Sequence, residues 1–275
     1  MSREHFAAEW LSLREPVDHR SRAAGLVPIL ATGRRREPLR VLDLGAGTGS
    51  NLRYLAPRMP GPQHWTLVDH DQHLLDAATG PDAADRVNRV RADLSDLSCL
   101  DIVGTDVVTG SALLDLVSED WLRLLVDECC RGSCRALFAL TYDGSIDWRT
   151  PVDGRDGHES DDELVRGLAN LHQRKDKGFG PALGPTAGAV AHTLFQQAGY
   201  RTWLVPSPWR LGPTDTEVAR TLVEGWQSAA SSPGPVGEGV QVDRIGEWAS
   251  RRLHAIATGD FELCVGHVDL LAMPA

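Results

Sequence analysis

A strand pattern that runs directly into a glycine-rich turn constrains this fold more than any other feature of the sequence. Residues 39–44 read LRVLDL, and residues 45–49 read GAGTG, with a glycine at every second position. Glycine has no Cβ and tolerates positive φ, so a ligand can contact the main chain where the following helix offers free N–H groups. The pattern predicts a strand, a ligand-binding turn and a helix, in that order.

Six further apolar segments read as strands, and helical patterns separate most of them. Strands that alternate with helices favour a mostly parallel, doubly wound sheet covered on both faces, in which ligands bind at the carboxyl ends of the strands. We therefore expect an α/β, Rossmann-like fold. The six segments are residues 64–69, 87–91, 105–109, 134–141, 200–206 and 261–273.

The length of 275 residues is compatible with a single domain, and we interpret the whole chain as one. Residues 1–38 predict an N-terminal helical region. Residues 142–185 and 207–260 are too long for simple α/β connections, so we expect a lid-like insertion and a helical insertion before the last strand. Residues 231–239, rich in Ser, Pro and Gly, predict a surface loop.

The composition is that of a globular protein, with 42% hydrophobic residues and a formal net charge of −10. An acidic surface repels phosphate backbones, which disfavours a nucleic-acid partner. No apolar run approaches the roughly 18 residues of a membrane helix, and residues 1–10 lack a secretion signal, so we expect no membrane partner and a cytoplasmic location. Arginine supplies 26 of the 28 basic residues, which suggests a GC-rich, bacterial coding sequence.

The cysteines and histidines give no sign of a metal site. The five cysteines form no C-x-x-C pair, and their odd number favours reduced thiols over a disulfide framework. None of the ten histidines has ligand spacing with a cysteine. We expect no metal.

Residues 43–49 read D-L-G-A-G-T-G, and this spacing separates two kinds of nucleotide site. A dinucleotide fingerprint needs its third glycine one place later, where Ser50 stands. With the motifs at residues 65–69, 90–94 and 106–115, this segment resembles the class I S-adenosylmethionine-dependent methyltransferases over about residues 39–141. The resemblance implies S-adenosylmethionine as cofactor, and a seven-stranded Rossmann-like sheet with an antiparallel last strand.

The resemblance also implies roles for individual residues. Asp69, at the end of a strand, would accept hydrogen bonds from the ribose hydroxyls, with His70 beside it. Asp93 and the N–H of Leu94 would meet the adenine. The remaining cofactor residues of the matching motifs are Asp43, Gly45, Ala46, Gly47 and Gly49 in the turn, and Thr109, Gly110 and Ser111 near the reacting methyl group.

The sequence says less about the methyl acceptor. His172 is a candidate general base because imidazole titrates near neutrality, Asp143 is a second candidate, and Tyr142 could orient the acceptor. Arg174, Lys175 and Lys177 could attract an anionic group, or they could simply complement a helix C-terminus.

Two arginines near the N-terminus have an equally open role. Arg14 or Arg22 could close over the cofactor carboxylate, and a solvated helix face is the alternative.

These patterns predict transfer of a methyl group from S-adenosylmethionine to a small molecule by direct in-line displacement. A hydroxyl oxygen is the preferred acceptor atom because a candidate base can be named, and nitrogen or carbon acceptors stay open. Three alternatives stay open: a non-catalytic or regulatory S-adenosylmethionine-binding protein, methylation of a protein or RNA, and a nicotinamide-dependent oxidoreductase. A homodimer is possible, because the apolar helices of the second insertion suit either the sheet edge or a partner.

Overall fold

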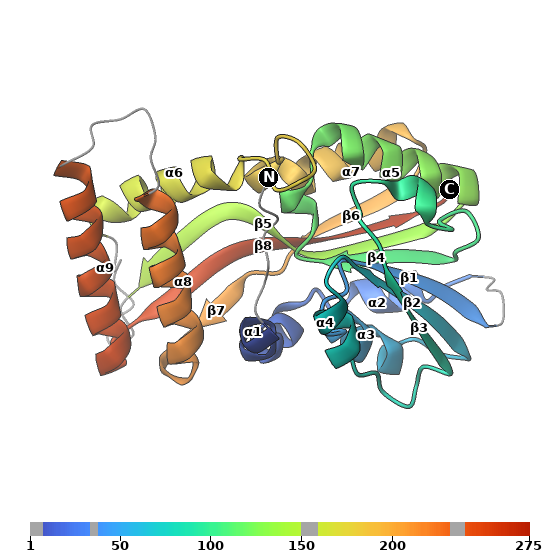
Figure 1. The fold of residues 1–275 in the computed structure, drawn as a ribbon, viewed down its shortest axis with the longest axis horizontal. Helices are drawn as coiled ribbons and strands as arrows, with labels where there is room; N and C mark the ends of the chain where they lie inside the picture. The colour runs from blue at the N-terminus through green and yellow to red at the C-terminus, as the bar shows by residue number, and fades with distance from the viewer. Residues whose placement is uncertain (1–7, 34–37, 150–158, 232–239) are drawn as a thin grey trace.

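The computed structural model describes residues 8–33, 38–149, 159–231 and 240–275. Its centre is a mixed sheet in the order β3-β2-β1-β4-β5-β8-β6, with a short strand β7 paired to β8 (Figure 1). The strands are β1 Leu39–Leu44, β2 Gln63–Asp69, β3 Arg86–Arg91, β4 Val107–Ser111, β5 Arg135–Arg149, β6 Arg201–Pro206, β7 Trp209–Leu211 and β8 Glu262–Met273.

The strand directions confirm the Rossmann-like α/β prediction. Strands β1 to β5 run parallel to one another. Strand β8 runs antiparallel to β5, β6 and β7. The described residues contain eight strands rather than seven. The additional strand is β7, whose three residues follow Pro206 and precede Gly212, so it is too short to give a periodic pattern.

Helices cover both faces of the sheet, which explains why β1 is apolar on both sides. One core packs Leu42 and Phe138 against α5 and α7, and the other packs Val41 and Leu137 against α2, α3 and α4. The helices are α1 Ala8–Ser21, α2 Leu26–Leu30, α3 Ser50–Leu55, α4 Gln72–Ala77, α5 Glu119–Gly132, α6 Ser160–Gln173, α7 Ala187–Gln197, α8 Thr216–Ala230 and α9 Val240–Thr258.

Strands β5 and β8 continue beyond the parallel part of the sheet and, with β7 paired along β8, form a three-stranded ribbon that carries α6, α8 and α9 (Figure 1). Ile146 and Trp148 on this ribbon are buried in a third core beneath those helices. The strand expected at residues 134–141 therefore extends to Arg149, and the insertion expected from residue 142 begins as strand. The predicted loop at 231–239 lies, apart from residue 231, outside the described residues.

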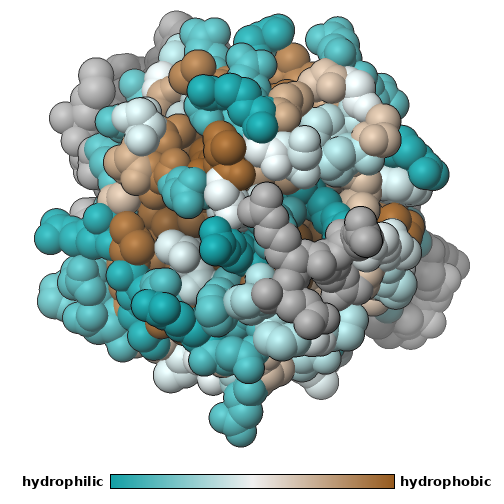
Figure 2. All heavy atoms as spheres, turned by 90° about the vertical axis from the view of Figure 1, so that its right-hand side faces the viewer, coloured by the Kyte–Doolittle hydropathy of each residue, from teal (hydrophilic) through white to brown (hydrophobic). Residues whose placement is uncertain are grey.

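The opposite end of the molecule is mainly polar. Figure 2 shows the end at which β1 begins, where hydrophilic residues cover most of the surface and hydrophobic residues gather in one area. In the part of the chain that the structure describes, no helix has the length and apolar character needed to cross a bilayer. All five cysteines are free thiols.

Candidate functional site

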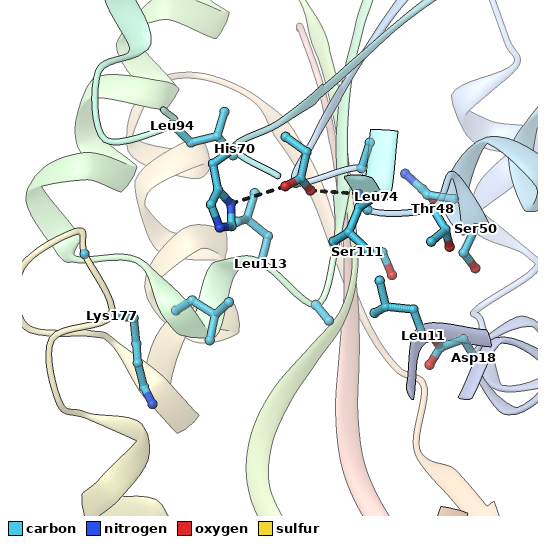
Figure 3. A pocket seen from close by; sticks show the side chains of 18 of the residues that line it. Leu11, Asp18, Thr48, Ser50, His70, Leu74, Leu94, Ser111, Leu113 and Lys177 are labelled. Atoms are coloured by element: carbon cyan, nitrogen blue, oxygen red, sulfur yellow. Dashed lines mark hydrogen bonds and ion pairs between the residues drawn. The ribbon is translucent and has the colours of Figure 1, made fainter. Parts of the chain in front are cut away.

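A cavity opens at the carboxyl ends of β1, β2 and β4, between α1 and the segment that follows α6 (Figure 3). The cavity has a volume of about 160 Å³, and its mouth opens to solvent. The cavity is lined by Leu11, Arg14, Asp18, Gly45, Ala46, Gly47, Thr48, Ser50, Asn51, Asp69, His70, Leu74, Asp93, Leu94, Ser111, Ala112, Leu113, Leu116, Lys177, Gly178 and Phe179.

The glycine turn between β1 and α3 forms the floor of the cavity. Gly45, Gly47 and Gly49 have φ values of 65°, 52° and 84°, the left-handed region that favours glycine. A Cβ on Gly47 would lie 3.1 Å from Cδ1 of Leu11, so α1 approaches the turn closely. Because these three residues have no side chains, the backbone of the turn is accessible to a ligand at their positions.

Asp69, at the end of β2, is held rigidly at the cavity edge although it is only 6% exposed. Its Oδ2 accepts a hydrogen bond from Gly47 N at 2.8 Å, and its Oδ1 accepts one from Asp71 N at 3.0 Å. His70 Nδ1 lies 3.2 Å from Oδ1, and Figure 3 marks this contact. A carboxylate fixed in this way is pre-organised to accept further hydrogen bonds from ligand hydroxyls.

Asp43 lies beneath the turn and does not line the cavity. It is fully buried, and its Oδ1 accepts a hydrogen bond from Asn51 Nδ2 at 2.8 Å. Burial raises the pKa of Asp43 to about 7, the Asn51 hydrogen bond and the Arg22 charge oppose the rise, and the Asp69 charge adds to it. Its Oδ2 has no hydrogen-bond partner among the described residues. This oxygen can therefore accept a further hydrogen bond directly below the cavity.

Asn51 connects Asp43 to the strands and to the N-terminal region. Its Nδ2 also donates to Thr109 Oγ1 at 3.0 Å, while Arg22 Nη1 donates to Asn51 Oδ1 at 3.0 Å. Thr109 is therefore a buried support rather than a lining residue. Gly110 is buried too. A Cβ there would lie 3.0 Å from the Leu44 carbonyl oxygen.

An apolar slot, formed by Leu94, Leu113 and Phe179, lies beside Asp93 at the β3 side of the cavity. The Leu94 carbonyl accepts a hydrogen bond from Trp121 Nε1 at 2.6 Å. Phe179 packs edge-on against Trp121, with ring centroids 5.7 Å apart, and Asp93 Oδ1 accepts from Ser95 N at 3.1 Å. The slot suits a flat ring with polar edges.

Helix α1 covers the cavity from the other side. Leu11, Arg14 and Asp18 recur at helical spacing and face inward, and burial raises the pKa of Asp18 against the opposing charge of Arg14. The helix is held by His19 Nε2, 3.1 Å from Ser50 Oγ, and by Arg53 Nε, which donates to Glu15 at 2.7 Å. Of the two arginines considered at the cofactor, Arg14 lines the cavity and Arg22 points into the buried network below it.

The residues predicted for the acceptor lie mostly outside the cavity lining. Tyr142, whose pKa burial raises, donates its hydroxyl to Asn170 Oδ1 at 2.8 Å. Asp143 is exposed on the ribbon and accepts from Ser145 N at 2.9 Å. His172 is partly buried on α6. Of the three cations, Arg174 and Lys175 are exposed, and Lys177 lines the cavity.

Sequence reasoning missed about half of the lining. A helical pattern in residues 1–38 was visible, but nothing indicated which face of it meets the turn. The unpredicted lining residues are Leu11, Asp18, Thr48, Ser50, Asn51, Leu74, Ala112, Leu113, Leu116, Gly178 and Phe179.

Comparison with known proteins agrees with this geometry. Residues 41–132, which hold the glycine turn and the ends of β2, β3 and β4, match the family model of a methyltransferase domain. Residues 41–132 are therefore a methyltransferase domain, and the protein is an S-adenosylmethionine-dependent methyltransferase. No curated protein matches the methyltransferase significantly.

Solved structures share the fold of the methyltransferase at low sequence identity. A cyclopropane-fatty-acyl-phospholipid synthase-like protein from Lactobacillus casei is 16% identical, with a TM-score of 0.57, over 99% of this chain and 96% of that one. The YcgJ protein of Bacillus subtilis is also 16% identical, with a TM-score of 0.50, over 93% and 98% of the two chains. Both structural similarities extend over nearly the whole chain.

The residues present fit S-adenosylmethionine, the cofactor of the methyltransferase. The cradle at Gly47 would be filled by any Cβ, and the unpaired Oδ2 of Asp43 lies fully buried beneath it. A cationic ligand with a sugar and a flat base would contact the glycine turn, Asp69 and the apolar slot. The buried carboxyl group of Asp43 would lie beneath it.

Proposed function

We propose that the methyltransferase transfers the methyl group of S-adenosylmethionine to a hydroxyl oxygen of a small molecule bound in the same cavity. The observation that carries this proposal is that α1 and residues 177–179 both cover the cavity. An acceptor must fit between them, which favours a small molecule over a folded protein or RNA. The net charge of −10 also disfavours RNA.

For the cofactor we propose that Asp69 binds the ribose and that Asp93 and Leu94 bind the adenine. The turn of Gly45, Ala46, Gly47 and Gly49 would lie beside the chain that leads from the ribose to the sulfonium. Ser111, which lines the cavity at the end of β4, would lie near the transferred methyl group. Thr109 and Gly110 precede it on the same strand, and Asn51 joins Thr109 to Asp43. When bound, the cofactor supplies a methyl group made electrophilic by the sulfonium. The protein contributes orientation and desolvation.

For the acceptor we propose that the described part of the first insertion after β5, residues 159–185, acts as a lid. Tyr142 and His172 belong to one connected region, because the Tyr142 hydroxyl bonds Asn170, one turn or less before His172 on α6. Gly178 and Gly180, with φ of 104° and 86°, flank Phe179, so the backbone here can bend where other residues would be strained. Lys177 lines the cavity, where it would attract an anionic group. His172 or Asp143 would take the hydroxyl proton, and Arg174 and Lys175 would add positive charge, after an inward movement of the lid, since these four residues lie outside the lining.

Methyl-labelled S-adenosylmethionine tests the proposal. The purified protein is incubated with separate pools of phenols and hydroxy acids, small amines, unstructured peptides and RNA, and the label is followed by mass spectrometry. We expect a methyl ether among the small hydroxylated compounds, formed in equal amount with S-adenosylhomocysteine. Label in peptide or RNA would contradict the acceptor class, and cofactor binding without any transfer would favour a non-catalytic binding protein.

A further inference from the structure

A second pocket lies at the end of the sheet where β5 and β6 begin. Arg135 is the first residue of β5, Arg201 is the first of β6, and Met273 is the last of β8, and all three line this pocket. Figure 1 shows β8 ending on this side of the molecule. The cofactor cavity opens instead at the carboxyl ends of the parallel strands. The two sites therefore lie at opposite ends of the sheet, and they share no lining residue.

The floor of this second pocket is apolar. Ile29, Trp203 and Met273 line it, and all three are only partly buried against the core that contains Val41 and Leu137. Trp203 belongs to β6, which stands at one end of the strand order and is therefore an edge strand. A half-buried indole on an edge strand offers a flat apolar surface to a ligand.

The charge of the second pocket is opposite to that of the protein as a whole. Among the described residues that line it, Arg135 and Arg201 are basic and none is acidic. The whole chain, in contrast, has a formal net charge of −10. A local excess of positive charge above an apolar floor favours an anion that has an apolar body.

Both guanidinium groups have contacts that hold them at the pocket. Arg135 Nη1 donates a hydrogen bond to the carbonyl oxygen of Leu30 at 3.0 Å. Gly33, with a φ of 82°, lies beside the same guanidinium, since a Cβ there would be 3.4 Å from Arg135 Nη2. The Arg201 guanidinium lies over the ring of Trp203, with its Cζ 5.4 Å from the ring centroid. A planar guanidinium that is already positioned can bind both oxygens of a carboxylate at a reduced cost in conformational entropy.

We propose that this second pocket binds a small aromatic carboxylate as a further ligand of the methyltransferase. The carboxylate accepts hydrogen bonds from Arg135 and Arg201, and the aromatic ring lies on the apolar floor beside Trp203. Because the two sites share no lining residue, this ligand binds together with S-adenosylmethionine and does not displace it. The inference depends neither on the identity of the methyl acceptor nor on its mode of binding.

Calorimetry with three probes tests the second pocket. The probes are 2-naphthoate, its neutral amide 2-naphthamide, and inorganic phosphate, which has charge but no ring. We expect 2-naphthoate to bind at least about tenfold more tightly than either of the others, because it alone offers both the ring and the charge. Its affinity should be the same with and without saturating S-adenosylhomocysteine. Arg201→Gln should weaken 2-naphthoate binding by about tenfold, through the loss of one charge-assisted hydrogen bond.

Arg58→Gln is a matched control for Arg201→Gln. Arg58 is exposed like Arg201, and its Cζ lies 4.1 Å from the centroid of an aromatic ring, that of Tyr54, but it does not line the pocket. The control variant should leave 2-naphthoate binding within about twofold of the wild type. Trp203→Leu keeps both arginines of the pocket and should still weaken the probe, because the flat surface is lost.

Four results would overturn the proposal. Equal affinities for 2-naphthoate and 2-naphthamide would show that the charge is not recognised, and phosphate binding as tight as that of 2-naphthoate would show that the ring is not. Displacement of 2-naphthoate by S-adenosylhomocysteine would place the probe in the cofactor cavity. Unchanged binding in Arg201→Gln would remove the second pocket as its site.

Discussion

Asp269 on β8 accepts a hydrogen bond from the backbone N–H of Leu140 on β5, at 2.8 Å. Leu140 has a φ of 53° and lies at the register shift where β5 begins to leave the regular ladder. Asp269 Oδ1 also accepts from Ser207 Oγ at 2.7 Å, and Oδ2 from Ala23 N at 2.9 Å. One buried carboxylate therefore joins the bulge, the end of β6 and the exit from α1.

We predict that Asp269→Ala is among the most destabilising single changes in the chain. It leaves three donors without their acceptor, each at a cost of about 1–3 kcal/mol when buried, so we expect a loss of at least about 3 kcal/mol. Urea unfolding measures it, with the exposed Asp147→Ala on the same ribbon as control. Similar stabilities for the two variants would contradict the role of Asp269.

Asp69→Ala should weaken S-adenosylhomocysteine binding by about 1–3 kcal/mol, since the proposed ribose hydroxyls lose a charged acceptor. Calorimetry measures the change, and Asp82→Ala, an exposed acid, is the control. Unchanged affinity would remove Asp69 from the cofactor site.

Gly47→Ala should reduce cofactor affinity more than it reduces stability. Its Cβ would meet Leu11 at 3.1 Å and enter the cavity floor. Gly61→Ala is a matched control, because Gly61 has a φ of 84° with no atom within 4 Å of the new Cβ. Both variants carry the backbone strain of a left-handed alanine. Equal effects on binding would show that only this strain matters.

Asp43 makes stability depend on pH. Its pKa rises from 3.8 in the unfolded chain to about 7 in the native state, so the native state binds the proton more tightly. Its contribution to stability is fullest below about pH 4 and declines as pH rises to about 7. The Asp43→Asn variant should therefore become more stable relative to the wild type as the pH rises through this window, by about a few kcal/mol in free energy of unfolding. Urea unfolding at several pH values tests this, and a constant difference between the two proteins would refute it.

His172→Ala should lower turnover by about 100-fold or more if His172 is the general base, with little change in cofactor affinity. The measurement uses the acceptor found in the labelling assay, with Lys175→Ala as a control from the same segment. If turnover persists in His172→Ala and is lost in Asp143→Asn, Asp143 is the base instead.

The parallel half of the fold was predictable because its strands are short and bounded by turns, and all except the exposed β3 are largely buried. The extension of β5 was not, because Asp143, Gly144 and Ser145 read as a turn although Ile146 and Trp148 resume the alternation. The polar interruption is the second register shift against β8. A bulge and a turn have similar local composition, and only the partner strand distinguishes them.

The same limit applies to the candidate site. Asp69, Asp93 and the glycine turn could be proposed from local motifs at strand ends. Asp18 could not, since its place depends on how α1 packs against Ser50 and Arg53, more than 30 residues away. The placement of His172 and Lys177 likewise depends on where α6 ends in space.

The packing beneath α6, α8 and α9 forms its own cluster, apart from the two that support the ends of β1 and β2. Side-chain volume in that cluster can change without disturbing the strands that carry Asp43 and Asp69, because interior packing is constrained mainly by immediate neighbours. Evolution could thus change the packing beneath α6, α8 and α9 for new chemistry, while the strands that carry Asp43 and Asp69 stay as they are.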